Sequence, residues 1–197
     1  MNNEKKSQAL TRLQDQMQEA HHVADDFFAK HSIDLINVAE EMGKCLAAGG
    51  KILTCGNGGS ASDAQHFSGE MIGRFMKERK ALPAIALSTD TAILTAVGND
   101  YGYDQIFSRS VEALGNAGDM LFAISTSGKS PNVLKAVEVA RGKKMKIVAM
   151  TGGSGGSLGA MADFHLNVAM GKNSARIQEV HIKIIHLLVD LLDEIYS

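Results

Sequence analysis

The sequence predicts an α/β fold, a three-layer sandwich in which helices flank a central parallel sheet. Short apolar runs alternate with longer stretches of helical periodicity, which is the pattern of strands joined by crossover helices. Three of the apolar runs lead directly into loops rich in glycine and serine. Parallel sheets bind ligands beyond the carboxyl ends of their strands, so these loops are the expected location of a site.

Each expected element follows from its own pattern. Residues 5–30 and 32–48 carry apolar positions at helical spacing, and Gly49 with Gly50 ends the second stretch, so two N-terminal helices are expected. The expected strands cover residues 51–55, 84–88, 119–125, 146–151 and 164–169. The helices expected after them cover residues 60–75, 90–100, 103–114, 131–143 and 174–197. The last helix is apolar on most of its circumference, which in a small chain indicates a subunit interface.

Composition restricts the class of protein. The chain has 197 residues, of which 45% are hydrophobic and 21% charged, as in a soluble globular protein. A formal net charge of −2 gives no support to nucleic-acid binding. Cys45 and Cys55 form neither a disulfide framework nor a CxxC metal site, and we interpret them as buried, reduced thiols. Without a signal segment or a membrane-length apolar run, we expect a cytoplasmic protein with no membrane partner.

We expect a single domain over residues 1–197, because no linker, repeat or low-complexity segment interrupts the chain. Within it, residues 1–48 supply the N-terminal helices, and residues 49–197 supply the α/β core with its C-terminal helix.

The segment CGNGGSASDAQHFSGE, residues 55–70, contains the first glycine loop. Its GNGGSA part fits the dinucleotide fingerprint G-x-G-x-x-A in the right strand–turn–helix setting. That fingerprint also needs an acidic residue about 20 positions further on, at the end of the next strand. The acidic residue in that place, Asp90, lies more than 30 positions beyond Gly56, so the pattern argues against a dinucleotide.

A second loop, AISTSGKS at residues 123–130, nearly fits a phosphate-binding P-loop. Ala123 stands where the first glycine belongs, and Pro131 directly follows the motif. Four hydroxyls nevertheless precede an expected helix N-terminus, where amides and the helix dipole favour an anion. These are Ser125, Thr126, Ser127 and Ser130. They favour a single terminal phosphate on a small molecule; simple capping by Ser127 or Ser130 accounts for one hydroxyl only.

Histidine and glutamate side chains suggest a metal or a proton-transfer site. His66 and Glu70 are four residues apart, so they share a helix face, unless they form only a common surface contact. The last helix adds Gln178, His181 and His186, and together these nitrogen and oxygen donors are of the kind that Zn²⁺ accepts. Gln178 and His186 are eight residues apart, roughly 12 Å along a straight helix, so His181 is the easier partner of Gln178 by geometry.

Four segments carry a family resemblance. They are CGNGGSASDAQHFSGE, NDYGYDQIFSRSVEALG, ISTSGKSPNV and ARIQEVHIKIIH. In order and spacing they resemble the phosphoheptose isomerase family of sugar isomerase (SIS) domains, whose fold is flavodoxin-like. The match runs from about residue 45 to the end and extends to the helical N-terminus.

The resemblance implies an aldose–ketose isomerase that converts sedoheptulose 7-phosphate to D-glycero-D-manno-heptose 7-phosphate. This reaction is the first step towards the nucleotide-activated heptose of lipopolysaccharide core or related glycans. The resemblance also implies a homotetramer with active sites between subunits and one zinc ion per subunit.

The family's functional residues carry over position by position. The implied substrate contacts are Asn57, Gly58, Gly59, Glu70, Asn99, Asp100, Ser125, Thr126, Ser127, Ser130 and Gln178. The implied zinc ligands are His66, Glu70, Gln178 and His186. The resemblance therefore favours His186 over His181 as a ligand. Glu70 is the natural base and His186 the natural acid of an enediol mechanism. The 12 Å argument then predicts that Gln178 and His186 share one site only across a subunit boundary or through a bent helix.

Two alternatives stay open at this stage. Some relatives keep the fold without catalysis and bind the DnaA replication initiator, but Glu70 and His186 are retained here and favour an enzyme. Another SIS isomerase, acting on a pentose or hexosamine phosphate, would share the fold and the phosphate loop. The chain length of the substrate cannot be inferred from these motifs.

Overall fold

A computed structural model describes all residues, 1–197, and contains one five-stranded sheet. The strands are β1 (Ile52–Cys55), β2 (Ala84–Ala86), β3 (Met120–Ser125), β4 (Lys146–Gly152) and β5 (Phe164–Val168). They pair in the order β2-β1-β3-β4-β5, and every pair is parallel. The predicted fold class is therefore confirmed, and the strand order changes direction between β1 and β3, where such sheets bind ligands.

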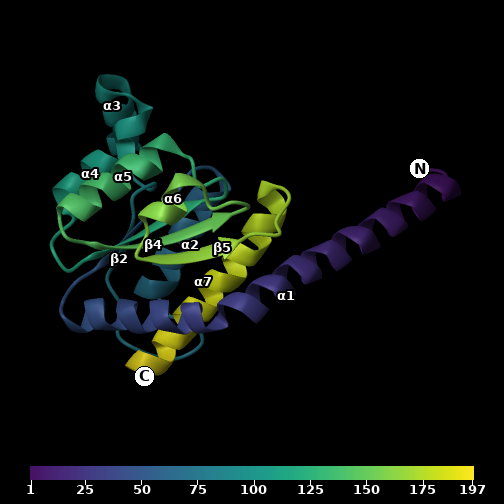
Figure 1. The fold of residues 1–197 in the computed structure, drawn as a ribbon, viewed down its shortest axis with the longest axis horizontal. Helices are drawn as coiled ribbons and strands as arrows, with labels where there is room; N and C mark the ends of the chain where they lie inside the picture. Colours follow the sequence, from purple (N-terminus) through teal and green to yellow (C-terminus); the bar gives the residue numbers. More distant parts are fainter.

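Helices cover both faces of this sheet (Figure 1). They are α1 (Asn3–Ala47), α2 (Gly59–Ile72), α3 (Thr91–Tyr101), the short 3₁₀ helix η1 (Tyr103–Gln105), α4 (Ile106–Leu114), α5 (Pro131–Gly142), α6 (Gly156–Met161) and α7 (Ser174–Tyr196). Helices α1, α2 and α7 pack on one face, and α4, α5 and α6 pack on the other. None of these helices is long and apolar enough to cross a membrane.

The two faces have separate hydrophobic cores, because successive strand residues point in opposite directions. Ile52 of β1 lies in a cluster of 30 buried residues beneath α1, α2 and α7. Its neighbour Leu53 lies in a cluster of 16 buried residues beneath α4 and α5. Strands covered on both faces can be apolar throughout, which is why β1 and β3 appear in the sequence as uninterrupted apolar runs.

The N-terminal segment differs from prediction. Instead of two helices over residues 5–30 and 32–48, the chain forms the single 45-residue helix α1. The predicted break fell just before Ser32, but the hydroxyl of this serine donates to the carbonyl oxygen of Phe28 inside the helix. No proline or glycine interrupts residues 3–42, so the helix continues, and its first half projects away from the sheet (Figure 1).

The helix α6 was also absent from the prediction, because its start lies in the glycine-rich run GGSGGS. Leu158 supplies the reason for the helix: its side chain is fully buried beside α5. The amide of Leu158 also donates to the carbonyl oxygen of Gly128 at 3.0 Å, so α6 supports the serine loop that follows β3. Elsewhere the predicted elements are present, with their ends displaced by a few residues.

Candidate active site between the second and last helices

The loops after β1 and β3 are joined where the strand order reverses. The side-chain amides of Asn57 and Asn132 hydrogen-bond reciprocally, at 2.8 and 2.9 Å. The hydroxyl of Tyr103 donates to the same Asn57 oxygen at 3.1 Å. These three contacts fix the Asn57 side chain and leave one of its N–H groups for a ligand.

The two glycines after Asn57 have different structural reasons. Gly58 is the N-cap of α2 with φ of 55° and ψ of −123°, a backbone conformation that L side chains rarely adopt. Gly59 lies directly against α7, and a Cβ added there would overlap the side-chain amide of Gln178. Both glycines therefore let the start of α2 approach other groups closely, as expected for a loop that a ligand must reach.

Each of the predicted phosphate-binding hydroxyls has a polar contact in or next to the serine loop. The Ser125 and Ser130 hydroxyls lie 3.0 Å apart, and Thr126 lies 3.3 Å from the hydroxyl of Ser174 at the start of α7. Ser127 accepts a hydrogen bond from the Lys129 amide at 3.2 Å. Ser130 is the N-cap of α5, yet its side chain makes no capping hydrogen bond, so the capping alternative does not account for this serine.

The N-termini of α5 and α7 thus both meet the serine loop. Each helix N-terminus carries partial positive charge and free amides, which attract an anion. This arrangement suits a phosphate group at the carboxyl edge of the sheet.

A second group of predicted residues meets between α2 and α7. The Nε2 atoms of His66 and His186 lie 3.0 Å apart, although 120 residues separate them in sequence. A Glu70 carboxylate oxygen lies 3.4 Å from the same His66 nitrogen. Phe75, from the loop after α2, stacks on the His186 ring with centroids 5.3 Å apart. The side chains of His66 and Glu70 are 40% and 26% exposed, so a ligand can reach them.

His181, the geometrically easier choice from sequence, lies outside this group. Its side chain is fully buried, and its Nε2 donates to the carbonyl oxygen of Thr151 at 3.1 Å. Burial lowers the pKa of His181 to about 4, so the ring is neutral at physiological pH. Its Nδ1 faces Asp63 at 3.9 Å, and burial raises the pKa of that carboxyl to about 6. His186, not His181, therefore lies beside His66.

Three predicted residues lie apart from the histidine pair. Gln178 contacts Gly59 at the start of α2. On the continuous helix α7, Gln178 comes eight residues before His186, which is about 12 Å along the helix axis. Asn99 and Asp100 lie exposed at the end of α3 and hydrogen-bond to each other at 2.9 Å. Within one chain, these two residues contact none of the other predicted site residues through a hydrogen bond or ion pair.

Sequence reasoning missed four residues of this site: Phe75, Tyr103, Asn132 and Ser174. Tyr103 and Asn132 lie inside segments that were already singled out, NDYGYD and SGKSPNV, so closer attention to these motifs could have identified them. Phe75 follows no motif and is brought to His186 only by the course of the loop after α2.

The donors around His66 fit a metal ion in kind. The Nε2 atom of His66 lies near the Nε2 atom of His186 and near a carboxylate oxygen of Glu70. Zn²⁺ accepts imidazole nitrogens and carboxylate oxygens as ligands. No group of three or more His, Cys, Asp or Glu side chains in the single chain has the spacing to hold a metal ion by itself. Gln178 of the same chain does not join the three donors, as the 12 Å separation predicted.

Known proteins share both the sequence and the fold of this chain. The SIS domain family matches residues 16–152. The phosphoheptose isomerase of Neisseria gonorrhoeae is 51% identical over 195 residues, covering 94% of this chain and 98% of that protein. A solved structure of the Neisseria gonorrhoeae enzyme superposes with a TM-score of 0.89 at 46% identity, over 94% of this chain and 99% of that one. A phosphoheptose isomerase structure from Francisella tularensis gives 0.91 at 43% identity, over 94% and 98%.

The chain belongs to the SIS domain family, as the five-stranded parallel sheet and the match over residues 16–152 show. Within that family its relatives at about half identity over nearly their whole length are phosphoheptose isomerases, which are enzymes.

Proposed function

We propose that this chain is an aldose–ketose isomerase that converts sedoheptulose 7-phosphate to D-glycero-D-manno-heptose 7-phosphate. The observation that carries the proposal is the contact between His66 and His186 with Glu70 alongside, in a chain 51% identical to a phosphoheptose isomerase. The product would feed nucleotide-activated heptose synthesis for lipopolysaccharide core or a related glycan.

The reaction moves a proton between adjacent carbons through an enediol. In our proposal the Glu70 carboxylate removes a proton from C1 of the ketose, while His186 donates a proton to the carbonyl oxygen on C2. The enediol then collapses in the opposite sense: C2 receives the proton that Glu70 holds, and His186 removes the hydroxyl proton on O1. Both groups end as they began, as a catalyst requires. The 3.0 Å contact between His186 and His66 supports a ring held in one orientation.

The serine loop would bind the phosphate. The contacts of Ser125 with Ser130, the N-cap of α5, and of Thr126 with Ser174, at the start of α7, support this proposal, as does the place of Ser127 in the same loop. Anchoring the phosphate there fixes the far end of the sugar, so the reacting carbons are presented to Glu70 in a restricted set of orientations. Asn57, Gly58 and Gly59 would contact the sugar between these two ends.

We also propose one Zn²⁺ per subunit, held by His66, Glu70 and His186, because their nitrogen and oxygen atoms are the donors this ion prefers. With the ion bound, Glu70 and His186 would transfer protons only through the carboxylate oxygen and the ring nitrogen that do not ligate it. A bound Zn²⁺ supplies Lewis-acid polarisation of the sugar oxygens. Gln178 is 12 Å along α7 from His186, so in this proposal the fourth ligand is Gln178 of a second subunit. Metal analysis of protein prepared without chelator should find zinc, and its absence would contradict this part.

A homotetramer with sites at subunit interfaces belongs to the same proposal. The exposed end of α3 with Asn99 and Asp100, and the projecting half of α1, are surfaces that other subunits would cover. A cytoplasmic location is part of it too, and the two unpaired cysteines, both buried, support that location.

An assay with a panel of sugar phosphates tests the function directly. Sedoheptulose 7-phosphate should be isomerised in preference to five- and six-carbon ketose and aldose phosphates. Preference for a pentose or hexosamine phosphate would identify a different SIS isomerase. Turnover of no sugar phosphate, together with binding to the DnaA initiator, would identify a non-catalytic relative.

A further inference from the structure

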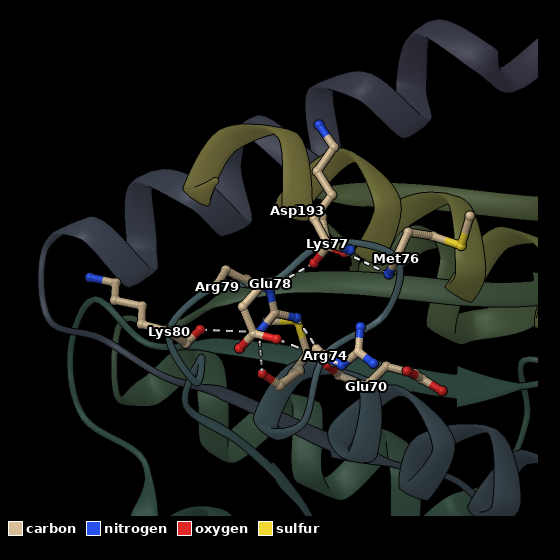
Figure 2. A network of polar contacts seen from close by, with 9 residues as sticks. Glu70, Arg74, Met76, Lys77, Glu78, Arg79, Lys80 and Asp193 are labelled. Carbon is tan, nitrogen blue, oxygen red and sulfur yellow. Dashed lines mark hydrogen bonds and ion pairs between the residues drawn. The ribbon is translucent and has the colours of Figure 1, made fainter.

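A buried ion pair joins the loop after α2 to the last turns of α7 (Figure 2). The Nε atom of Arg79 lies 2.7 Å from an Asp193 carboxylate oxygen, and both side chains are fully buried. The other Asp193 oxygen accepts hydrogen bonds from the backbone amides of Met76 and Lys77, at 2.9 and 3.0 Å. One carboxylate on α7 therefore holds three donors of the loop at once.

Burial alone would raise the pKa of Asp193, but hydrogen bonds from Lys77, Arg79 and Met76 outweigh it and hold the pKa below the ordinary value. Asp193 is therefore a carboxylate at neutral pH, and the pair is a true ion pair. Removing one partner alone would leave an uncompensated buried charge.

The guanidinium of Arg79 also caps the C-terminus of α2. Its Nη2 donates to the carbonyl oxygen of Glu70 at 2.9 Å, and its Nη1 donates to that of Met71 at 2.9 Å and of Lys80 at 3.1 Å. The last carbonyls of a helix have no partner inside the helix, and Arg79 supplies partners for two of them. The first of these belongs to the residue that we propose as the base.

We propose that Arg79, held by Asp193, is a positioning residue for the isomerisation: it fixes the last turn of α2, and with it the Glu70 side chain, relative to His186 on α7. This inference rests on the proposed function, because it assumes that Glu70 and His186 act together. Phe75, in the same loop, stacks on His186, so the loop that Arg79 secures touches both reacting residues. No functional role had been expected from sequence for Arg79 or Asp193.

Three variants separate positioning from stability. Arg79→Lys keeps a positive charge opposite Asp193, but a single ammonium cannot reproduce the forked contacts to three carbonyl oxygens. The double variant Arg79→Met with Asp193→Leu removes both charges together, a change that buried ion pairs often tolerate in folding. Lys77→Met is the matched control: Lys77 makes an exposed ion pair with Glu194, from the same loop to the same helix, without touching α2.

The measurements are kcat and KM for sedoheptulose 7-phosphate, thermal unfolding, and amide hydrogen exchange in the last turn of α2. We expect Arg79→Lys and the double variant to fold and to lose roughly ten- to hundredfold in kcat, since a small misplacement of a reacting group is enough. KM should change by less than about twofold, because the serine loop is untouched. Exchange at residues 70–73 should accelerate in both variants and stay unchanged in Lys77→Met.

A double variant that folds and keeps wild-type kcat would overturn the proposal, as would an equal loss of kcat in Lys77→Met. If the double variant does not fold, Arg79→Lys alone decides by the same criteria. A wild-type chain without turnover would refute the proposed function, but not the inference that Arg79 and Asp193 fix the last turn of α2. Hydrogen exchange then decides. Equal exchange at residues 70–73 in Arg79→Lys and Lys77→Met would show that Arg79 does not fix the last turn of α2.

Discussion

The His186 ring contacts two other rings: Phe75 stacks on it, and His66 meets it at a tilt, Nε2 to Nε2. A residue held in this way loses little further freedom when substrate binds, which favours its role as an acid. Glu70 lies beside the same pair, one helical turn beyond His66. The residue-scale arrangement thus places a candidate acid and a candidate base on two different helices, close to the contact between His66 and His186.

Substituting the two reacting groups tests this arrangement. Glu70→Gln and His186→Gln should each fold normally and lose kcat by at least about a hundredfold, because each removes a proton-transferring group. Steady-state kinetics with sedoheptulose 7-phosphate and circular dichroism provide the measurement. Glu112→Gln, on the far face of the sheet at α4, is the control and should keep wild-type kcat. Near-normal turnover in either site variant would refute the assignment.

The buried pair of Asp63 and His181 makes a separate prediction about pH. Burial raises the pKa of Asp63 to about 6, so its stabilising contribution is present at low pH and is lost as pH rises through 6. Burial lowers the pKa of His181 to about 4, so its contribution is present above about 6.5 and is lost as pH falls towards 4. Between these values the two contributions oppose each other.

Asp63→Asn removes one side of this balance. The free energy of unfolding should then fall more steeply than in the wild type as pH is lowered from about 6.5 to 4, because His181 acts alone. Urea unfolding at several pH values measures the slope. An exposed aspartate on α1, Asp15, offers the control substitution Asp15→Asn. Equal slopes in Asp63→Asn and wild type would show that Asp63 does not titrate in this range.

At the scale of elements, the loops at the carboxyl edge of the sheet support each other. Gly128, in the serine loop, has φ of 64°, and a Cβ added there would overlap the backbone carbonyl of Gly155 before α6. The Leu158 amide of α6 donates to the Gly128 carbonyl oxygen. The serine loop therefore takes its shape from contact with a second glycine loop, and the proposed phosphate site depends on both.

Gly128→Ala should therefore destabilise the chain by roughly 2–4 kcal/mol and weaken phosphate-dependent substrate binding, because strain and a backbone overlap combine. Gly142→Ala is the matched control. Gly142 lies in α5 without positive φ, and an added Cβ there meets nothing within 4 Å. It should be neutral or slightly stabilising, as alanine favours helix. Thermal unfolding and KM provide the comparison, and equal effects of the two substitutions would contradict this account.

The elements also show where sequence reasoning succeeds. Strands β1, β3 and β4 are buried almost throughout and appear as apolar runs, and all five strands were predicted within a few residues. The continuity of α1 could not be predicted from Ser32, because a serine can cap a helix or, as here, bond back to Phe28 inside it. Helix α6 was not predicted, because glycines disfavour a helix. Burial of the Leu158 side chain stabilises the helix in spite of them.

The candidate site could be predicted from the sequence where its motif is local. His66 and Glu70 share one helix, so their spacing revealed them. The choice between His181 and His186 depends on which face of α7 meets α2, and only the fold decides that. The pairing of Asn57 with Asn132 joins residues 75 positions apart, and no local pattern carries that information.

For the whole molecule, the first half of α1 is the least explained surface of a single chain. Leu10, Leu13 and Met17 are 58%, 60% and 56% exposed, at the three- and four-residue spacing of a helix–helix contact. These three side chains belong to neither hydrophobic core of the chain. The stripe that they form fits the proposed homotetramer, in which another copy would cover it.

Replacing Leu10, Leu13 and Met17 together by serine should lower the oligomeric state and leave the sheet domain folded. Light scattering after gel filtration measures the mass, and circular dichroism measures the fold. The control replaces Gln8, Gln14 and Gln18, polar residues of the same segment, by serine. A triple variant that keeps the wild-type mass would show that this stripe does not hold the subunits together.

Helices α2 and α7 run in the same direction, since Gly59 meets Gln178 near their starts and His66 meets His186 two turns later. The position of one helix along the other therefore determines which of their residues face each other. One residue inserted into α7 between these contacts would turn His186 about 100° away from His66, and would turn the buried Asp193 away from Arg79 as well. The proposed acid and the ion pair that holds the loop after α2 therefore depend on one and the same helical register, and a change in the length of α7 would disturb both together.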